Sequence, residues 1–144
     1  NASEARRELA LVRDYIQKND LEALRELLII ICSGIPYTIQ ETRNSESPEC
    51  YYQTVFYMIF WLANLDIQVE AASSIGRMDA LVTTNSHRYI FELKISGSAQ
   101  DALNQIKEKK YYQKFLTEDR KIILIGVKFD PVHRNITEWL VEEH

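Results

Sequence analysis

The sequence predicts an α/β fold in which a mixed central sheet is flanked by helices. Helical apolar periodicity fills most of residues 3–64, and three short strand patterns then follow one another with gaps too short for a helix. Another helical segment separates these strands from a continuous apolar run at residues 121–127. Because a helical crossover joins parallel strands, this fourth strand can lie parallel to a strand of the preceding meander.

The first two helices form an N-terminal lead-in. Residues 3–18 carry apolar side chains at three- and four-residue spacing, as expected of an amphipathic helix. Asn19 and Asp20 end this helix and cap the next one, which we expect over residues 21–32. The polar stretch 38–47 predicts a loop.

A third helix is predicted over residues 48–64. Ser47 is a suitable N-cap, Pro48 fits the first helical position, and the acid Glu49 suits the positive end of the helix dipole. The apolar stripe is broad, which favours packing against a sheet. Its members are Tyr52, Val55, Phe56, Ile59, Phe60 and Ala63.

The strands that follow are expected over residues 66–71, 77–83 and 87–95, joined as an antiparallel meander by short connections. A helix is then predicted over residues 99–115, with Gln105 close to its apolar inner face.

Two more strands complete the predicted sheet. The run at residues 121–127 is typical of a central strand covered on both faces, and residues 135–141 predict a final strand.

The composition describes an ordinary soluble domain. The 144 residues suffice for one domain and one core, and 46% of them are hydrophobic and 26% charged. The net charge of −4 does not indicate nucleic-acid binding. The longest apolar run, residues 55–63, is too short to cross a membrane. Cys32 and Cys50 fit neither a disulfide framework nor a zinc site, so we expect a reducing, cytoplasmic environment.

The third predicted strand carries charged residues among apolar ones. Side chains alternate between faces, so Glu92 and Lys94 are neighbours on one face, and Asp79 stands on the preceding strand. Burying charge is costly unless the charges pair or bind a metal. The pattern therefore predicts either a divalent-metal site or a structural ion pair. The same Glu-x-Lys spacing at residues 108–110 is expected to be a solvated helix face.

A basic stretch lies between residues 107 and 121. Aromatic residues are interleaved with its basic ones, a mixture found on nucleic-acid-binding surfaces and also on solvated helix faces. The basic residues are Lys107, Lys109, Lys110, Lys114, Arg120 and Lys121.

Several sequence motifs lie along the second half of the chain. They are Gly76-Arg77-x-Asp79, Tyr89-Ile90-Phe91-Glu92-Leu93-Lys94, Ala102-Leu103-x-Gln105-Ile106-Lys107-x-Lys109-x-Tyr111, Lys121-Ile122-Ile123-Leu124-Ile125-Gly126-Val127-x-Phe129, and Arg134-Asn135-Ile136 followed by Trp139. Together they resemble the PD-(D/E)XK nuclease superfamily, specifically the nuclease-like C-terminal domain of bacterial proteins with an AAA-ATPase-like N-terminal half. The resemblance implies a restriction-endonuclease-like αβββαβ core. It also implies that residues 1–46 are a helical lead-in, or a linker from an ATPase-like domain, and that residues 47–144 are the nuclease-like domain.

The resemblance further implies a metal site. Asp79 and Glu92 would be ligands of Mg²⁺ or Mn²⁺, with the main-chain carbonyl of Leu93 as a third. Lys94 would hold or activate the attacking water and stabilise charge developing on the phosphate, and Gln105 would face the site as a catalytic helix residue.

Other residues are implied around this centre. An additional acid would come from Glu49 or Glu70, and both qualify by position. The substrate-binding residues would be Arg77, Lys107, Lys109, Tyr111 and Tyr112. The implied function is a Mg²⁺-dependent deoxyribonuclease, with DNA and an ATPase-like domain of the same polypeptide as partners and no membrane. The alternatives are a catalytically silent binding or regulatory module with a nuclease fold, and an interaction domain in which the three charged residues form a buried salt bridge.

Overall fold

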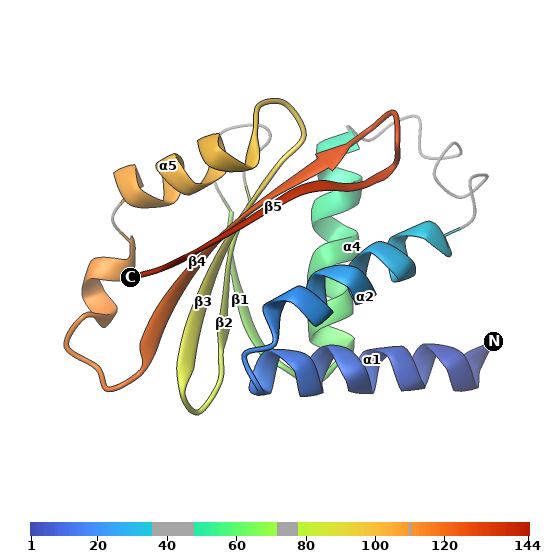
Figure 1. Ribbon diagram of the computed structural model, residues 1–144, viewed down its shortest axis with the longest axis horizontal. Coiled ribbons are helices and arrows are strands. Elements are labelled where there is room, and N and C mark those ends of the chain that lie inside the picture. Colours follow the sequence, from blue (N-terminus) through green and yellow to red (C-terminus); the bar gives the residue numbers. More distant parts are fainter. Residues whose placement is uncertain (36–47, 72–77, 110) are drawn as a thin grey trace.

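A five-stranded mixed sheet forms the centre of the computed structural model (Figure 1), which describes residues 1–35, 48–71, 78–109 and 111–144. The strands follow their sequence order across the sheet, and every neighbouring pair is antiparallel except β3 and β4, which are parallel. The predicted meander and the parallel fourth strand are therefore confirmed. The strands are β1 (Asp66–Ala71), β2 (Met78–Thr83), β3 (His87–Lys94), β4 (Lys121–Asp130) and β5 (Asn135–Glu143).

Helices cover both faces of the sheet, as Figure 1 shows. Three of them, α1 (Ala2–Gln17), α2 (Leu21–Ser33) and α4 (Pro48–Leu62), pack on one face. The crossover helix α5 (Ala99–Lys109) packs on the other face. This arrangement confirms the predicted α/β fold with a restriction-endonuclease-like order of elements.

The N-terminal helices are joined to the sheet through a hydrogen-bonded turn. The side chain of Asp20 accepts a bond of 3.2 Å from the main-chain nitrogen of Ala23, which confirms it as the cap of α2. The hydroxyl of Tyr89 on β3 lies 2.8 Å from Oδ1 of Asn19 and 3.1 Å from the main-chain oxygen of Ile16. Residues of α1 and α2 thus belong to the same core as the sheet.

Two apolar cores lie on the two faces of the sheet. The larger one contains Tyr89 and Phe91 of β3 with the buried faces of α1, α2 and α4, and the smaller one lies under α5 and contains Ile90. Strand β4 contributes alternate residues to both cores, which explains its continuous apolar sequence.

Several element ends differ from the prediction, and the differences in α5, β4 and β5 have structural reasons. The α-helix predicted over residues 99–115 ends at Lys109, and a 3-10 helix, η1 (Tyr111–Phe115), follows. Its tighter turns still place Tyr112 and Phe115 against the smaller core. Strands β4 and β5 extend to Asp130 and Glu143, beyond the predicted ends, because they continue to pair with each other.

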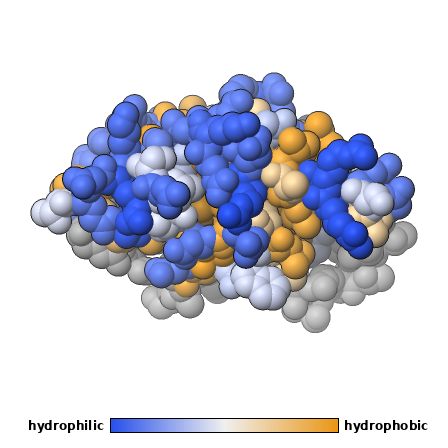
Figure 2. All heavy atoms as spheres, turned by 90° about the horizontal axis from the view of Figure 1, so that it is seen from below, coloured by the Kyte–Doolittle hydropathy of each residue, from blue (hydrophilic) through white to orange (hydrophobic). Residues whose placement is uncertain are grey.

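The surface is mainly hydrophilic on the face seen in Figure 2, and hydrophobic residues show between the hydrophilic ones, most of them right of centre. The exposed large apolar side chains include Ile30 of α2 and Trp61 and Leu62 of α4. No helix among the described residues combines the length and apolar character needed to span a membrane.

Candidate active site

Glu92 is a fully buried carboxylate at the centre of the sheet, with an exposed fraction of 0%. Its neighbours Phe91 and Leu93 point into the larger core on the opposite face, so the predicted alternation along β3 is confirmed. In the register of the strands, the Cα partner of Glu92 is Asp79 on β2, and the partner of Asp79 is Glu70 on β1. The backbone positions of three acids therefore form one row across the sheet.

Helix α5 supplies two polar groups to Glu92. Nε2 of Gln105 donates to Oε1 of Glu92 at 2.7 Å, and the amide oxygen accepts from Nζ of Lys94 at 2.9 Å, in the amide orientation that satisfies both neighbours. Nζ of Lys109 lies 3.3 Å from the same Oε1 of Glu92. The buried carboxylate is therefore compensated by an amide and an ammonium group from one helix.

The polar residues of α5 form a stripe that matches the charges on β3. Asp101, Gln105 and Lys109 are four residues apart, so they share one face of the helix. The carboxylate of Asp101 and the ammonium of Lys94 both lie within 3.3 Å of the position that a Cβ on Gly97 would take. The stripe places Asp101 near Lys94 of β3. It also places Lys109 against Glu92 of the same strand.

The pKa of Asp101 lies below its usual value. Hydrogen bonds from the main chain and the hydroxyl of Ser98 are the main cause, and the positive charges of Lys94 and Lys128 add to it. Asp101 is therefore a stable negative charge next to Lys94 at neutral pH.

The start of α5 is held close to the sheet by two residues of β4 and β5. A Cβ on Gly126 would overlap the main-chain oxygen of Ala99 and lie 3.2 Å from Cβ of Ala102, so only glycine allows this approach. The carboxylate of Glu138 accepts a bond of 3.0 Å from the main-chain nitrogen of Ala99. Because Gly126 is the parallel partner of Glu92, this contact fixes the height of α5 above the carboxylate.

Several predicted site residues fall on parts of the chain that the structure does not describe. Arg77 lies outside the described residues. Glu49 stands in the first turn of α4 and Glu70 in β1, but their side chains, like those of Asp79 and Tyr111, are outside the described set.

Leu93 can take part in the site only through its main chain. Its side chain is buried in the larger core, on the face opposite to Glu92. This geometry is compatible with the carbonyl role implied for it.

Two of the predicted substrate-binding residues contact residues at or just after the end of β5. Nζ of Lys107 lies 2.7 Å from Oε1 of Glu142, and the ring of Tyr112 lies 4.4 Å, between centroids, from that of His144. The ion pair with Glu142 neutralises the charge of Lys107 in the basic stretch.

Glu118, an acid within the basic stretch, pairs with two arginines. Its carboxylate accepts two bonds from Arg88, of 2.6 Å and 3.0 Å, and lies 3.7 Å from Nη1 of Arg120. The carboxylate of Glu118 is therefore shared between Arg120 of the basic stretch and Arg88 of β3.

The expectation that residues 108–110 are a solvated helix face is wrong for Lys109. Glu108 is exposed, whereas the Lys109 side chain is only 18% exposed because it points to Glu92. The four-residue spacing from Gln105 was the signal for this placement, since residues that far apart share a helix face.

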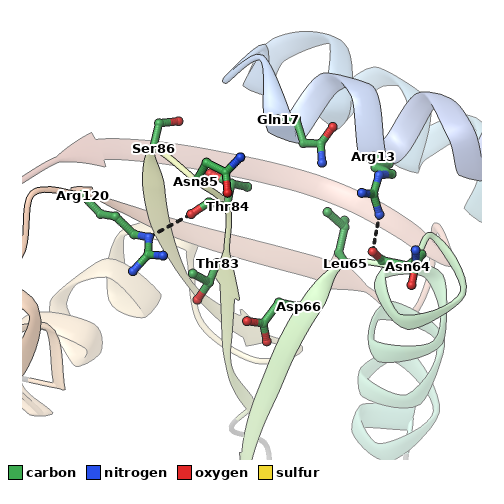
Figure 3. Close-up of a pocket in the computed structure, with 10 residues that line it drawn as sticks. All are labelled: Arg13, Gln17, Asn64, Leu65, Asp66, Thr83, Thr84, Asn85, Ser86 and Arg120. Carbon is green, nitrogen blue, oxygen red and sulfur yellow. Dashed lines mark hydrogen bonds between the residues drawn. The ribbon is translucent and has the colours of Figure 1, made fainter.

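A separate polar pocket of about 480 Å³ lies at the other end of the sheet, where β3 begins. Figure 3 shows Arg13 and Arg120 on opposite sides of it, with Asp66 and the turn between β2 and β3 between them. Arg13 donates to the main-chain oxygen of Asn64, and Nε of Arg120 donates to that of Thr84 at 2.9 Å. None of the predicted site residues whose side chains the structure describes lines this pocket.

The fold and the site together define a class of protein. A mixed sheet with an acid and a lysine two residues apart on a central strand, facing a crossover helix, is the architecture of restriction-endonuclease-like proteins. The sequence profile of the PD-(D/E)XK nuclease superfamily matches residues 47–139, and the chain belongs to this superfamily.

One similar protein is named "Uncharacterized protein in vnfD 5'region", from Azotobacter chroococcum mcd 1. It is 33% identical over 138 residues, which are 94% of this chain and 27% of the relative. The chain thus spans about a quarter of the length of this relative. No solved structure matches the chain.

Members of this superfamily generally use divalent metal ions. Glu92 suits such an ion, because its carboxylate is a hard oxygen donor and its Cα partner in the register is another acid, Asp79. Among the side chains that the structure describes, no three His, Cys, Asp or Glu residues gather as a metal site, a set that does not include Asp79, Glu70 or Glu49.

Proposed function

We propose that the chain is a metal-dependent phosphodiester hydrolase that cleaves DNA. The observation that carries this proposal is the buried carboxylate of Glu92, connected through Gln105 to Lys94 on the same strand face, with Asp79 as its partner in the register. A structural ion pair explains the two charges less well, because it does not require an acid at position 79 on the neighbouring strand.

In this proposal each polar residue has a distinct task. Asp79 and Glu92 hold Mg²⁺ or Mn²⁺, with the carbonyl of Leu93 as a further ligand. The ion supplies charge to polarise the phosphate and lowers the pKa of a coordinated water. Lys94 orients the attacking water and stabilises negative charge on the phosphate.

Gln105 acts in this scheme as a positioning residue. Its amide oxygen accepts a hydrogen bond from Nζ of Lys94, which limits the directions in which the lysine can point. Its amide nitrogen holds one oxygen of Glu92. A catalytic ammonium group gains from such support because small displacements reduce rates strongly.

Glu70 and Glu49 are both candidates for the additional acid. Glu70 is supported by its place in the row with Asp79 and Glu92. Glu49 is supported by its position at the start of α4, at the same end of the sheet as the end of β3 (Figure 1). Titration of Mn²⁺ into the Glu70→Gln and Glu49→Gln variants distinguishes them. Only the variant that has lost a metal ligand should bind Mn²⁺ more weakly than the wild type.

The substrate side of the proposal comprises DNA contacts by five residues around the site. Lys109 is supported by its contact with Glu92, whereas the pairing of Lys107 with Glu142 limits its free charge. The five residues are Arg77, Lys107, Lys109, Tyr111 and Tyr112.

We also propose that the chain works beside an ATPase-like domain of the same polypeptide, in the cytoplasm. The length of the similar protein leaves room for further domains, since the chain covers 27% of it.

A catalytically silent nuclease-fold module is the second candidate function. The net charge of −4 and the paired basic residues between 107 and 121 favour it, because both weaken attraction to DNA. This module would keep the fold but bind neither metal nor DNA tightly.

Plasmid cleavage with Mg²⁺ or Mn²⁺ tests the proposal. The wild type should nick or cleave DNA, and Asp79→Ala and Lys94→Ala should abolish this activity. Lys18→Ala is the matched control, because Lys18 is an exposed lysine paired with Asp14 on α1, and it should cleave like the wild type. Equal residual cleavage by the wild type and Lys94→Ala would identify a contaminant and contradict the proposal.

A further inference from the structure

We infer that Lys109 holds the place of a metal ion at Glu92: its ammonium group pairs with the carboxylate in the metal-free protein and leaves it when a divalent cation binds. The inference rests on the proposed metal site. It assigns to Lys109 a role in metal binding that differs from contact with substrate alone.

The first argument is the burial of the carboxylate. A fully buried carboxylate needs compensating positive charge or hydrogen bonds. Gln105 gives one hydrogen bond but no charge, and the ammonium of Lys94 is held by the oxygen of that amide. Lys109, at 3.3 Å, supplies a full positive charge to the same oxygen, Oε1, that the amide contacts. A divalent cation at the proposed site would bind the carboxylate of Glu92. The ammonium group of Lys109 and the cation therefore compete for this carboxylate.

The second argument is the position of Lys109 at the edge of the site. It is the last described residue of α5, and its side chain is 18% exposed, so its tip lies close to solvent. The flexible four-carbon stem of lysine allows the ammonium group to change position. Lys109 lies in the last turn of α5, where the helix dipole favours positive charge. Its ammonium group can therefore stay near the terminal carbonyl groups of the helix after it leaves the carboxylate.

The third argument is the contrast with Gln105. The glutamine lies inside α5 and bonds at both ends, to Glu92 and to Lys94, so it is suited to remain in place in both states. Lys109 has the opposite character, since a positive charge beside a bound dication is repelled. Once released, the same ammonium group is free to meet a phosphate of the substrate, which connects metal binding with DNA binding.

Calorimetric titration of Mn²⁺ into the wild type, Lys109→Met and Lys18→Met tests this exchange. Lys109→Met should bind Mn²⁺ roughly tenfold more tightly than the wild type, because the ion no longer has to displace the ammonium group. A change of this size is usual for two coupled binding events. Lys18→Met should match the wild type, because its lysine is exposed on α1. Equal or weaker binding by Lys109→Met, or no binding by any of the three proteins, would overturn the inference.

Thermal unfolding gives a second readout that does not depend on activity. Lys109→Met should melt below the wild type in EDTA, because Glu92 loses its charge partner, and Mn²⁺ should raise its Tm by more than it raises that of the wild type. If Lys109→Met does not fold, Lys109→Gln is judged by the same criterion. A wild type that binds Mn²⁺ without cleaving DNA would contradict the proposed function alone, whereas cleavage with unaltered affinity in Lys109→Met would contradict the exchange alone.

Discussion

The side-chain amide of Gln105 on α5 donates a hydrogen bond of 2.7 Å to the buried carboxylate of Glu92 on β3. The amide oxygen of the same residue accepts a bond of 2.9 Å from Lys94. One residue therefore positions both charged groups of the Glu-x-Lys motif, and the placement of α5 becomes part of the site.

Replacing Gln105 should reduce stability and activity together. Gln105→Leu removes a donor from a buried carboxylate, which should cost about 1–3 kcal/mol of unfolding free energy. Urea denaturation measures this loss. The matched control is Gln100→Leu, because the amide of Gln100 reaches only Asn104 on the exposed side of α5. Equal losses in the two variants would show that the amide does not support Glu92.

Gly126→Ala tests the close approach of α5 to the sheet. Its Cβ would overlap the oxygen of Ala99, so α5 must shift, and we expect a loss of about 1–3 kcal/mol in unfolding free energy and a clear loss of cleavage. Gly34→Ala is the control, since a Cβ there would lie 3.4 Å from the nearest atom, the oxygen of Ile31, in ordinary helical backbone. An unaltered Gly126→Ala protein would mean that the contact with Ala99 is unimportant.

The ion pair between Glu118 and Arg88 should make stability depend on pH. Hydrogen bonds from Arg88 lower the pKa of Glu118 below its usual value of 4.5. A lowered pKa in the folded state means that the pair stabilises the protein above the unfolded pKa, and that this contribution disappears as pH falls through the folded pKa. The difference in unfolding free energy between the wild type and Glu118→Gln should therefore be larger at pH 7 than at pH 3, because it decreases as the pH falls below 4.5. A difference that does not vary between these pH values would be inconsistent with the pair.

Cys32 should be unreactive in the folded protein. Burial raises the pKa of its thiol to about 11, and the side chain is only 3% exposed. At pH 8 roughly one thiol in a thousand would be ionised, compared with a sizeable fraction in the unfolded chain, where the pKa is about 8.5. In a Cys50→Ser background, a thiol reagent should label the protein only after denaturation. Rapid labelling of the native protein would contradict the burial of Cys32.

The sequence predicted the order of elements and the faces of β3 because these depend on local periodicity. Alternation alone places Glu92 and Lys94 on one face, and the continuous apolar run of β4 indicates a strand covered on both sides. The few residues between the predicted strands favour an antiparallel meander, and the strand pairing confirms it.

The contacts of α5 were less predictable because they join distant parts of the chain. The pair of Lys109 and Glu92 spans 17 residues, and it depends on the height at which Gly126 and Ala99 set the helix above the sheet. The end of α5 at Lys109 was also missed, since the apolar pattern continues through the 3-10 helix that follows. Tertiary packing decides both features.

The position of a bound Mn²⁺ ion tests the central claim most directly. Anomalous diffraction from a crystal soaked in Mn²⁺ should place the ion about 2.0–2.2 Å from a carboxylate oxygen of Glu92 and of Asp79, with Nζ of Lys109 withdrawn from Glu92. An ion bound elsewhere, or a Glu92 carboxylate still paired with Lys109 at saturating Mn²⁺, would contradict the account.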